Sequence, residues 1–131
     1  MVGKKRVAAV KKKPPAKRWV ALRPTTERDE QEKLCKWLTL QYPDVVFFSV
    51  PNDGKRTDAR KFHLHAVGML SGAPDLVILS KQPIFVEMKR VKGGHVSKEQ
   101  KMVHAWIRAL GYHMLVCKGF DDARKQLTPL L

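Results

Sequence analysis

The segments Asp75-Leu-Val-Ile-Leu-Ser80 and Ile84-Phe-Val-Glu-Met-Lys89 decide the fold of this chain. Both are rich in β-branched and large apolar residues, which is typical of strands. The turn residues Gln82-Pro83 separate them and predict a hairpin in which the two strands pair. Side chains alternate along a strand, so the glutamate and lysine of Glu87-Met88-Lys89 share one face. The hairpin brings them beside the aspartate that begins the first strand, and we expect two carboxylates and an ammonium at one edge of the sheet.

The rest of the sequence predicts helices on both sides of this hairpin and two further strands. Thr26 is a favourable N-cap for a helix over about residues 27–41, whose first turn is acidic and whose apolar residues recur at helical spacing. The other expected elements are a buried strand over residues 45–50, a short helix over 62–70, a helix over 97–110 ended by Gly111, a strand over 114–117 and a helix over 121–127. This order predicts an α/β domain with a mixed four-stranded sheet flanked by helices.

The chain is short and strongly basic. It has 131 residues and a formal net charge of +14, which fits one domain. Nine of its 26 lysines and arginines, and none of its 12 acids, fall in residues 1–23, so we expect a flexible basic tail before a single domain over residues 24–131. The tail is compatible with contact to nucleic acid, a nuclear signal or a solvated segment, and the basic domain beside it favours nucleic acid.

Several classes of protein are excluded or disfavoured by composition. The two cysteines, Cys35 and Cys117, are too few for a disulfide-dense scaffold, and their apolar surroundings predict buried structural thiols. The longest apolar run, Val45 to Val50, is too short to cross a bilayer, and Val7 to Val10 is too short for a secretory signal. We therefore expect a cytoplasmic protein that is not secreted. Trp106 falls on an apolar helical face, which favours a place in the core over a base-stacking role.

Two carboxylates beside a lysine suit metal-assisted phosphate chemistry. Mg²⁺ binds through a few carboxylates, keeps several waters and engages phosphate, while a lysine can orient water or neutralise developing charge. An ordinary alternative is an edge-strand ion pair of Glu87 with Lys89 or Lys92, with Asp75 capping a turn. The turn before Asp75, the placement on strands and the basic charge favour hydrolysis of phosphodiesters instead.

The chain resembles the VRR-NUC branch of the PD-(D/E)XK nuclease superfamily, and most closely its small stand-alone proteins of bacteriophages and bacteria. The resemblance runs from about Glu27 to Leu127 and is carried, in order, by Pro51-Asn52-Asp53-Gly54-Lys55-Arg56, Gly72-Ala73-Pro74-Asp75-Leu76, Phe85-Val86-Glu87-Met88-Lys89, Ser97-Lys98-Glu99-Gln100 and Gly111-Tyr112-His113. It implies a restriction-endonuclease-like core, an Mg²⁺ or Mn²⁺ cofactor, and a cytoplasm that is bacterial or phage-infected.

The resemblance also implies roles for particular residues. Asp75 and Glu87 correspond to metal ligands, with the Met88 carbonyl as a further oxygen, Lys89 to the catalytic lysine and Gln100 to an active-site glutamine. From its spacing with Ser97, Gln100 also fits a capping box at a helix start, a role that does not exclude the first.

The family has a further acidic ligand on its first helix. Glu27 is our preferred candidate, since it shares a helical stripe with Gln31 and Leu34, and Glu30 is the alternative. The basic residues that flank the predicted site in sequence are candidate phosphate contacts: Lys55, Arg56, Arg60, Lys61, Arg90 and Lys92.

The function implied is a metal-dependent DNA endonuclease that acts as a homodimer on branched DNA, in the manner of a Holliday junction resolvase. Two sites related by a two-fold axis suit symmetric cutting of a four-way junction. The alternatives are a flap or non-selective DNA nuclease, a catalytically inactive nucleic-acid-binding module, and an RNA-binding protein of ribosomal type.

Overall fold

The computed structural model describes residues 23–51 and 58–131, and all of the predicted elements in that part of the chain are present in the expected order. They are α1 (Glu27–Gln41), β1 (Val46–Ser49), α2 (Asp58–Ala66), β2 (Leu76–Leu79), β3 (Pro83–Lys89), α3 (Lys98–Ala109), β4 (His113–Lys118), α4 (Phe120–Leu127) and the 3₁₀ turn η1 (Thr128–Leu130). The basic tail predicted over residues 1–23 lies outside the described residues, apart from Arg23.

The four strands form one mixed sheet in the order β1-β2-β3-β4. The predicted hairpin is confirmed: β2 and β3 pair antiparallel, with Leu76 opposite Val86 and Leu79 opposite Pro83. β1 pairs antiparallel with β2, whereas β4 pairs parallel with β3 after the crossover through α3. Parallel neighbours require such a long connection, here provided by a helix.

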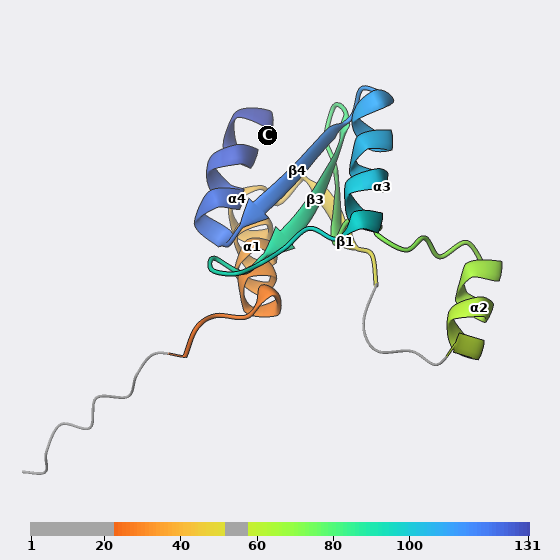
Figure 1. Ribbon diagram of the computed structural model, residues 1–131. Helices are drawn as coiled ribbons and strands as arrows, with labels where there is room; N and C mark the ends of the chain where they lie inside the picture. The colour runs from red at the N-terminus through yellow and green to blue at the C-terminus, as the bar shows by residue number, and fades with distance from the viewer. Residues whose placement is uncertain (1–22, 52–57) are drawn as a thin grey trace, which may run out of the picture.

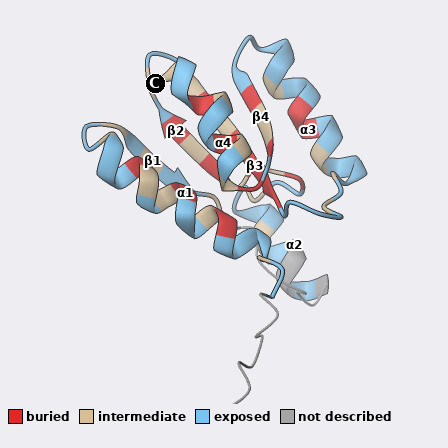
Figure 2. Cartoon of the chain, turned by 90° about the vertical axis from the view of Figure 1, so that its left-hand side faces the viewer, coloured by how far each residue is buried: buried red, intermediate tan, exposed pale blue. Residues whose placement is uncertain are grey.

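Helices cover both faces of this sheet. α1 and α4 lie on one face and α3 on the other, over β3 and β4 (Figure 1). Between the sheet and the first pair of helices lies a continuous apolar core, whose fully buried members include Leu34, Leu38, Ile78, Val86 and Leu127. The buried residues gather along the inner faces of the helices and the middle of the sheet (Figure 2). The predicted α/β fold is therefore confirmed.

The first helix begins as its sequence predicts. Thr26 is the N-cap, its hydroxyl oxygen accepts from the Asp29 amide at 3.1 Å, and the Asp29 carboxylate accepts from the Thr26 amide at 2.8 Å. This reciprocal arrangement satisfies amide donors that a helix start leaves without partners. No helix among residues 23–51 and 58–131 combines the length and apolar character needed to cross a bilayer.

Three expectations about burial and boundaries were wrong. β1 is an edge strand with exposed Val46 and Phe48, because α3 lies over the other end of the sheet and leaves this face uncovered. Trp106 is 54% exposed, since the buried side of α3 is the one that carries Val103 and His104. α2 starts before residue 62 and ends at Ala66, and it projects away from the sheet (Figure 1).

The prediction of two buried thiols is confirmed for Cys117 and wrong for Cys35. Cys117 is fully buried in the core, and Cys35 is half-buried. Burial, with a smaller contribution from Asp122, raises the pKa of the Cys117 thiol to about 12. A thiol with so high a pKa is a poor nucleophile at neutral pH.

Candidate active site

The last three residues of β3 extend past the end of β2. β2 begins at Leu76, opposite Val86, so Asp75 lies beside the extension. There the Met88 amide donates to Oδ2 of Asp75 at 2.7 Å. The backbone carbonyl of Asp75 also accepts from the Val50 amide at 2.8 Å, which continues the β1–β2 pairing. The aspartate is therefore fixed beside Glu87 through both its backbone and its side chain.

Glu87 and Lys89 form a buried ion pair at this end of the sheet. The Lys89 Nζ atom lies 3.0 Å from Oε1 of Glu87, and the two side chains are 7% and 2% exposed. They share one face of β3, as the strand period predicts, while Met88 between them is buried in the core. The predicted gathering of two carboxylates and one ammonium is what the structure has.

Gln100 connects this pair to the start of α3. Its Nε2 donates to Oε1 of Glu87 at 2.6 Å, and its Oε1 accepts from Lys89 Nζ at 3.2 Å. The same Oε1 accepts from the Ser97 amide at 2.9 Å, and the Gln100 amide donates to the Ser97 hydroxyl at 3.1 Å. The predicted capping box is confirmed, and one side chain both caps α3 and contacts the ion pair.

The turn before Asp75 packs tightly against this helix start. Gly72 has a φ of +85°, and a Cβ there would lie 2.6 Å from the carbonyl carbon of Glu99. Such a distance is well inside van der Waals contact, so only glycine allows this approach. The close contact ties the residues before β2 to the first turn of α3, and thereby places Asp75 and Gln100 around Glu87.

An open cavity of about 960 Å³ lies at the site, and it distinguishes the positions of the two candidate acids of α1. Glu27 lines this cavity together with Asp75, Glu87, Lys89 and Gln100. The stripe that the sequence predicts for Glu27 therefore faces the cluster.

Glu30 has a different role. It is buried, and its Oε2 accepts from the Phe120 amide at 2.6 Å, at the start of α4. Burial alone raises the pKa of Glu30, but hydrogen bonds from Thr25, the Phe120 amide and Lys33 together hold that pKa below its usual range. Because Gly119 offers no side-chain cap, Glu30 caps α4 from another helix.

The cluster carries excess negative charge. Burial is the main cause that raises the pKa of Glu87 to about 7, and the charges of Asp75 and Glu27 add to it against the opposing effect of Lys89. A carboxyl with this pKa is easily ionised or protonated at neutral pH, and a nearby cation stabilises its ionised form.

This donor set fits a hard divalent cation. Glu87, Asp75 and Glu27 bring three carboxylates to one cavity, and Oε1 of Glu87 is the oxygen on the side of Lys89 and Gln100, which line the same cavity. In the described part of the chain no group of three or more His, Cys, Asp or Glu side chains is arranged so that these side chains alone could hold a metal ion. An open site with water ligands is what Mg²⁺ prefers. The role suggested for the Met88 carbonyl stays a prediction.

Basic side chains lie next to the cluster. A second cavity of about 1120 Å³ shares Glu27 and Arg28 with the first, and it is also lined by Arg90 and Lys92. Of the other candidate phosphate contacts, Lys55 and Arg56 lie outside the described residues, as do the side chains of Arg60 and Lys61.

Two residues of the site were missed in the sequence. Arg28 lines both cavities, and only the position of α1 reveals this. His104 is buried, with Nε2 lying 3.8 Å from Oε2 of Glu87. Burial, Arg108 and Lys89 lower the pKa of His104, which favours the neutral ring. Its spacing of four residues from Gln100 was the available signal.

Comparison with known proteins supports the fold. A search of protein-family models and of curated proteins finds no match. Among solved structures, the chain is similar to one described as a VRR_NUC domain protein, at 21% sequence identity and a TM-score of 0.64. The similarity covers 82% of this chain and 89% of that one. The protein therefore has the α/β fold of a VRR_NUC domain, with an acidic cluster and one lysine where β3 ends.

Proposed function

We propose that this protein is a metal-dependent endodeoxyribonuclease of the PD-(D/E)XK type, which hydrolyses phosphodiester bonds. The observation that carries the proposal is the cluster at the end of β3, where Glu87 contacts both Lys89 and Gln100, and Asp75 and Glu27 line the same cavity. The VRR_NUC fold of a solved relative supports the same class of activity.

The metal ligands would be Asp75 and Glu87, with Glu27 and the Met88 carbonyl as further oxygens. A bound Mg²⁺ or Mn²⁺ lowers the pKa of its water and offsets the negative charge that develops on the phosphate. The buried ammonium of Lys89 orients the attacking water and neutralises charge on the phosphate oxygens. Gln100 holds that ammonium and the Glu87 carboxylate in place through one hydrogen bond to each.

DNA is the partner that fits the charge of the molecule. The chain carries a net charge of +14, and Arg28, Arg90 and Lys92 line the cavity next to the cluster. Side chains of this kind hold the phosphate backbone and position it without reading its sequence. We therefore expect cutting that depends on DNA structure more than on base sequence.

A homodimer acting on branched DNA extends this proposal. The edge of the sheet exposes apolar side chains, with Val46 directly opposite Leu79 and Phe48 further along the same face of β1. Exposed apolar side chains grouped on one face in this way favour a protein–protein interface. Two copies related by a two-fold axis would carry two cutting sites, as a four-way junction requires.

The test compares a labelled four-way junction with a flap and with a linear duplex of matching sequence, in Mg²⁺, in Mn²⁺ and in EDTA, with the oligomeric state measured by light scattering. We expect metal-dependent cutting by a dimer that favours the junction. Equal cutting of both substrates supports a non-selective nuclease, and preferential cutting of a flap supports a flap nuclease. Tight binding without cutting, by folded protein in either metal, supports an inactive binding module.

A further inference from the structure

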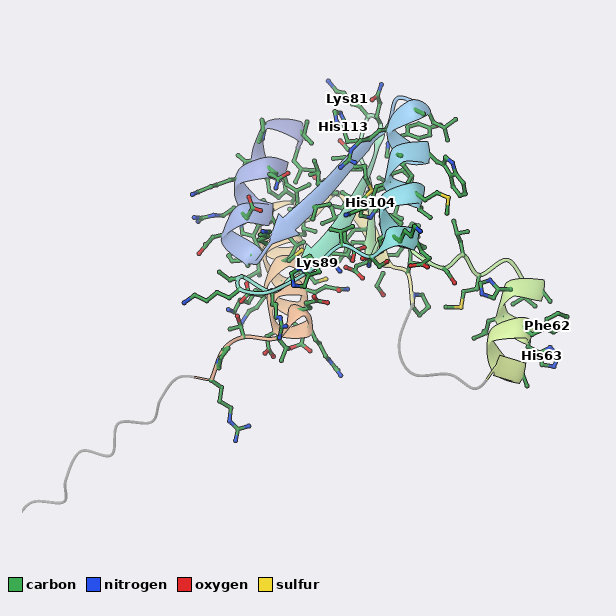
Figure 3. The ribbon with its side chains drawn as sticks, in the orientation of Figure 1. Phe62, His63, Lys81, Lys89, His104 and His113 are labelled. Carbon is green, nitrogen blue, oxygen red and sulfur yellow. The ribbon has the colours of Figure 1, made fainter. Side chains whose placement is uncertain are left out.

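α3 places two side chains, one helical turn apart, at the two oxygens of Glu87. Gln100 donates to Oε1 at 2.6 Å, and Nε2 of His104 lies 3.8 Å from Oε2. Residues four apart project from the same side of a helix. His104 lies where α3 packs on the sheet (Figure 3), so this helix faces the carboxylate with one polar group for each of its oxygens.

The two facing atoms stand out in the described part of the chain. Among the buried side-chain nitrogen and oxygen atoms of residues 23–51 and 58–131, only Oε2 of Glu87 and Nε2 of His104 lack a hydrogen-bond partner. Both side chains are 2% exposed. Unpaired buried polar groups are costly, whereas a leucine at position 104 would continue the apolar surface of Val103 without that cost. Packing alone therefore does not explain a histidine at this position.

We propose that His104 is a positioning residue, which holds Oε2 of Glu87 and so presents Oε1 to the divalent cation. This inference rests on the proposed function, since it takes Glu87 as a metal ligand. In its Nε2–H tautomer the ring donates to Oε2 once the 3.8 Å separation shortens by about 0.8 Å. Carboxylates that bind metals are themselves held by hydrogen bonds, and loss of such a partner typically weakens metal binding about 10–100-fold.

The other contacts of Glu87 agree with this assignment of its oxygens. Oε1 is the oxygen that contacts Lys89 and Gln100, and both of these residues line the cavity. Oε2 faces α3 instead. Without a donor at position 104, only the contacts of Oε1 orient the carboxylate, and Oε2 keeps no hydrogen-bond partner to limit its movement.

The test measures Mn²⁺ binding in the absence of DNA, from the electron paramagnetic resonance signal of free Mn²⁺. His104→Leu fills similar volume without a donor, and His104→Gln returns an amide nitrogen near the place of Nε2. We expect the leucine variant to bind Mn²⁺ about 10–100-fold more weakly, and the glutamine variant to remain within about threefold of the wild type. His113→Leu, at an exposed position on β4, is the matched control and leaves the Kd unchanged (Figure 3).

Thermal melts of each variant establish that the protein compared is folded, and His104→Phe, which also lacks a donor, replaces the leucine variant if that one does not fold. A folded variant without a donor that binds Mn²⁺ as tightly as the wild type overturns the inference and leaves the proposed function standing. Equal weakening by leucine and glutamine assigns His104 to packing and also overturns it. If the wild type binds no more Mn²⁺ than Glu87→Gln, the metal site itself is wrong and both proposals fail.

Discussion

Nε2 of Gln100 donates a hydrogen bond of 2.6 Å to Oε1 of Glu87, which lies 13 residues earlier in the chain. The opposite end of the same amide accepts from the Ser97 backbone and closes the capping box of α3. The two contacts use different atoms of one side chain, so the helix start and the acidic cluster hold each other in place. Substitutions at positions 97 and 100 can separate the two roles.

Gln100→Ala is expected to lower both stability and activity. It removes one half of the capping box, which typically stabilises a protein by about 1 kcal/mol, and it leaves Glu87 and Lys89 without their bridge. We expect cleavage to fall by about 10–100-fold, a loss typical for a group that orients ligands. Ser97→Ala is the matched control, because it removes only the cap. If both variants lose the same stability and the same activity, Gln100 acts through the helix start alone.

Glu87→Gln is expected to stabilise the metal-free protein at alkaline pH. The pKa of Glu87 is raised from 4.5 to about 7 in the folded protein, so the protonated carboxyl is favoured by folding. Its contribution to the free energy of unfolding is therefore complete below pH 4.5 and is lost as the pH rises through about 7. Glutamine does not ionise and avoids this loss. By linkage the variant should gain about 3 kcal/mol over the wild type at pH 8 and almost nothing near pH 4.5.

Thermal unfolding in EDTA, across this pH range, measures the effect. Saturating Mn²⁺ is expected to stabilise the wild type and not the Gln variant, since a ligand stabilises only the state that binds it. A difference between the two proteins that does not change with pH would contradict the buried, raised-pKa carboxyl on which the prediction depends.

Glu27→Gln and Glu30→Gln form a matched pair on one helix. Glu27 is exposed and lines the cavity, so its loss is expected to weaken Mn²⁺ binding and slow cleavage while the melting temperature changes little. Glu30 caps α4 through the Phe120 amide, so its loss is expected to cost about 1–3 kcal/mol of stability with activity per folded molecule retained. Lost stability in Glu27→Gln together with weakened Mn²⁺ binding in Glu30→Gln would show that the roles assigned to the two acids are reversed.

The Glu30 cap also predicts a loss of stability in acid. The pKa of this carboxyl is lower in the folded protein than its value of 4.5 in the unfolded chain. Its contribution to the free energy of unfolding is therefore present above pH 4.5 and is lost as the pH falls through the folded pKa. The stability of wild type and Glu30→Gln should therefore converge as the pH falls below 4.5 and through the lowered folded pKa. Denaturant titrations at a series of pH values measure this, and curves that stay parallel would exclude the cap.

Gly72→Ala is expected to disturb the site from a distance. The new Cβ would lie 2.6 Å from the Glu99 backbone, so the first turn of α3 must move and Gln100 must move with it. Gly111→Ala is the control, because Gly111 has a similar φ of +86° but open space around its Cβ position. Both variants bear the backbone strain, of order 1 kcal/mol, and only Gly72→Ala should also lose cleavage. Equal behaviour would show that the close approach does not matter.

The fold could be predicted from the sequence because its signals are local. Thr26 and three acids in the first turn predict helix α1. Gln82-Pro83 between two apolar runs predicts the hairpin. The meeting of Asp75, Glu87 and Lys89 follows from strand alternation and hairpin pairing, both of which are short-range rules.

What the sequence did not reveal depends on distant contacts. The exposure of Val46 and Trp106 follows from where α3 lies on the sheet, which no periodicity specifies. The capping of α4 by Glu30 joins residues 90 positions apart. In the sequence, His104 resembles an ordinary core residue. Only the structure places its ring opposite the carboxylate of Glu87. Pairs of this kind appear only once the elements are packed.

The central claim is that the cluster at the end of β3 hydrolyses DNA with the help of a divalent cation. The most direct measurement is the initial rate of four-way junction cleavage in Mn²⁺ and in EDTA, for the wild type, Asp75→Ala, Lys89→Ala and the exposed control Lys101→Ala. The account predicts metal-dependent cutting by the wild type and the control, with a loss of at least about 100-fold in the other two. Cutting that persists in EDTA, or in folded Asp75→Ala and Lys89→Ala proteins, would contradict it.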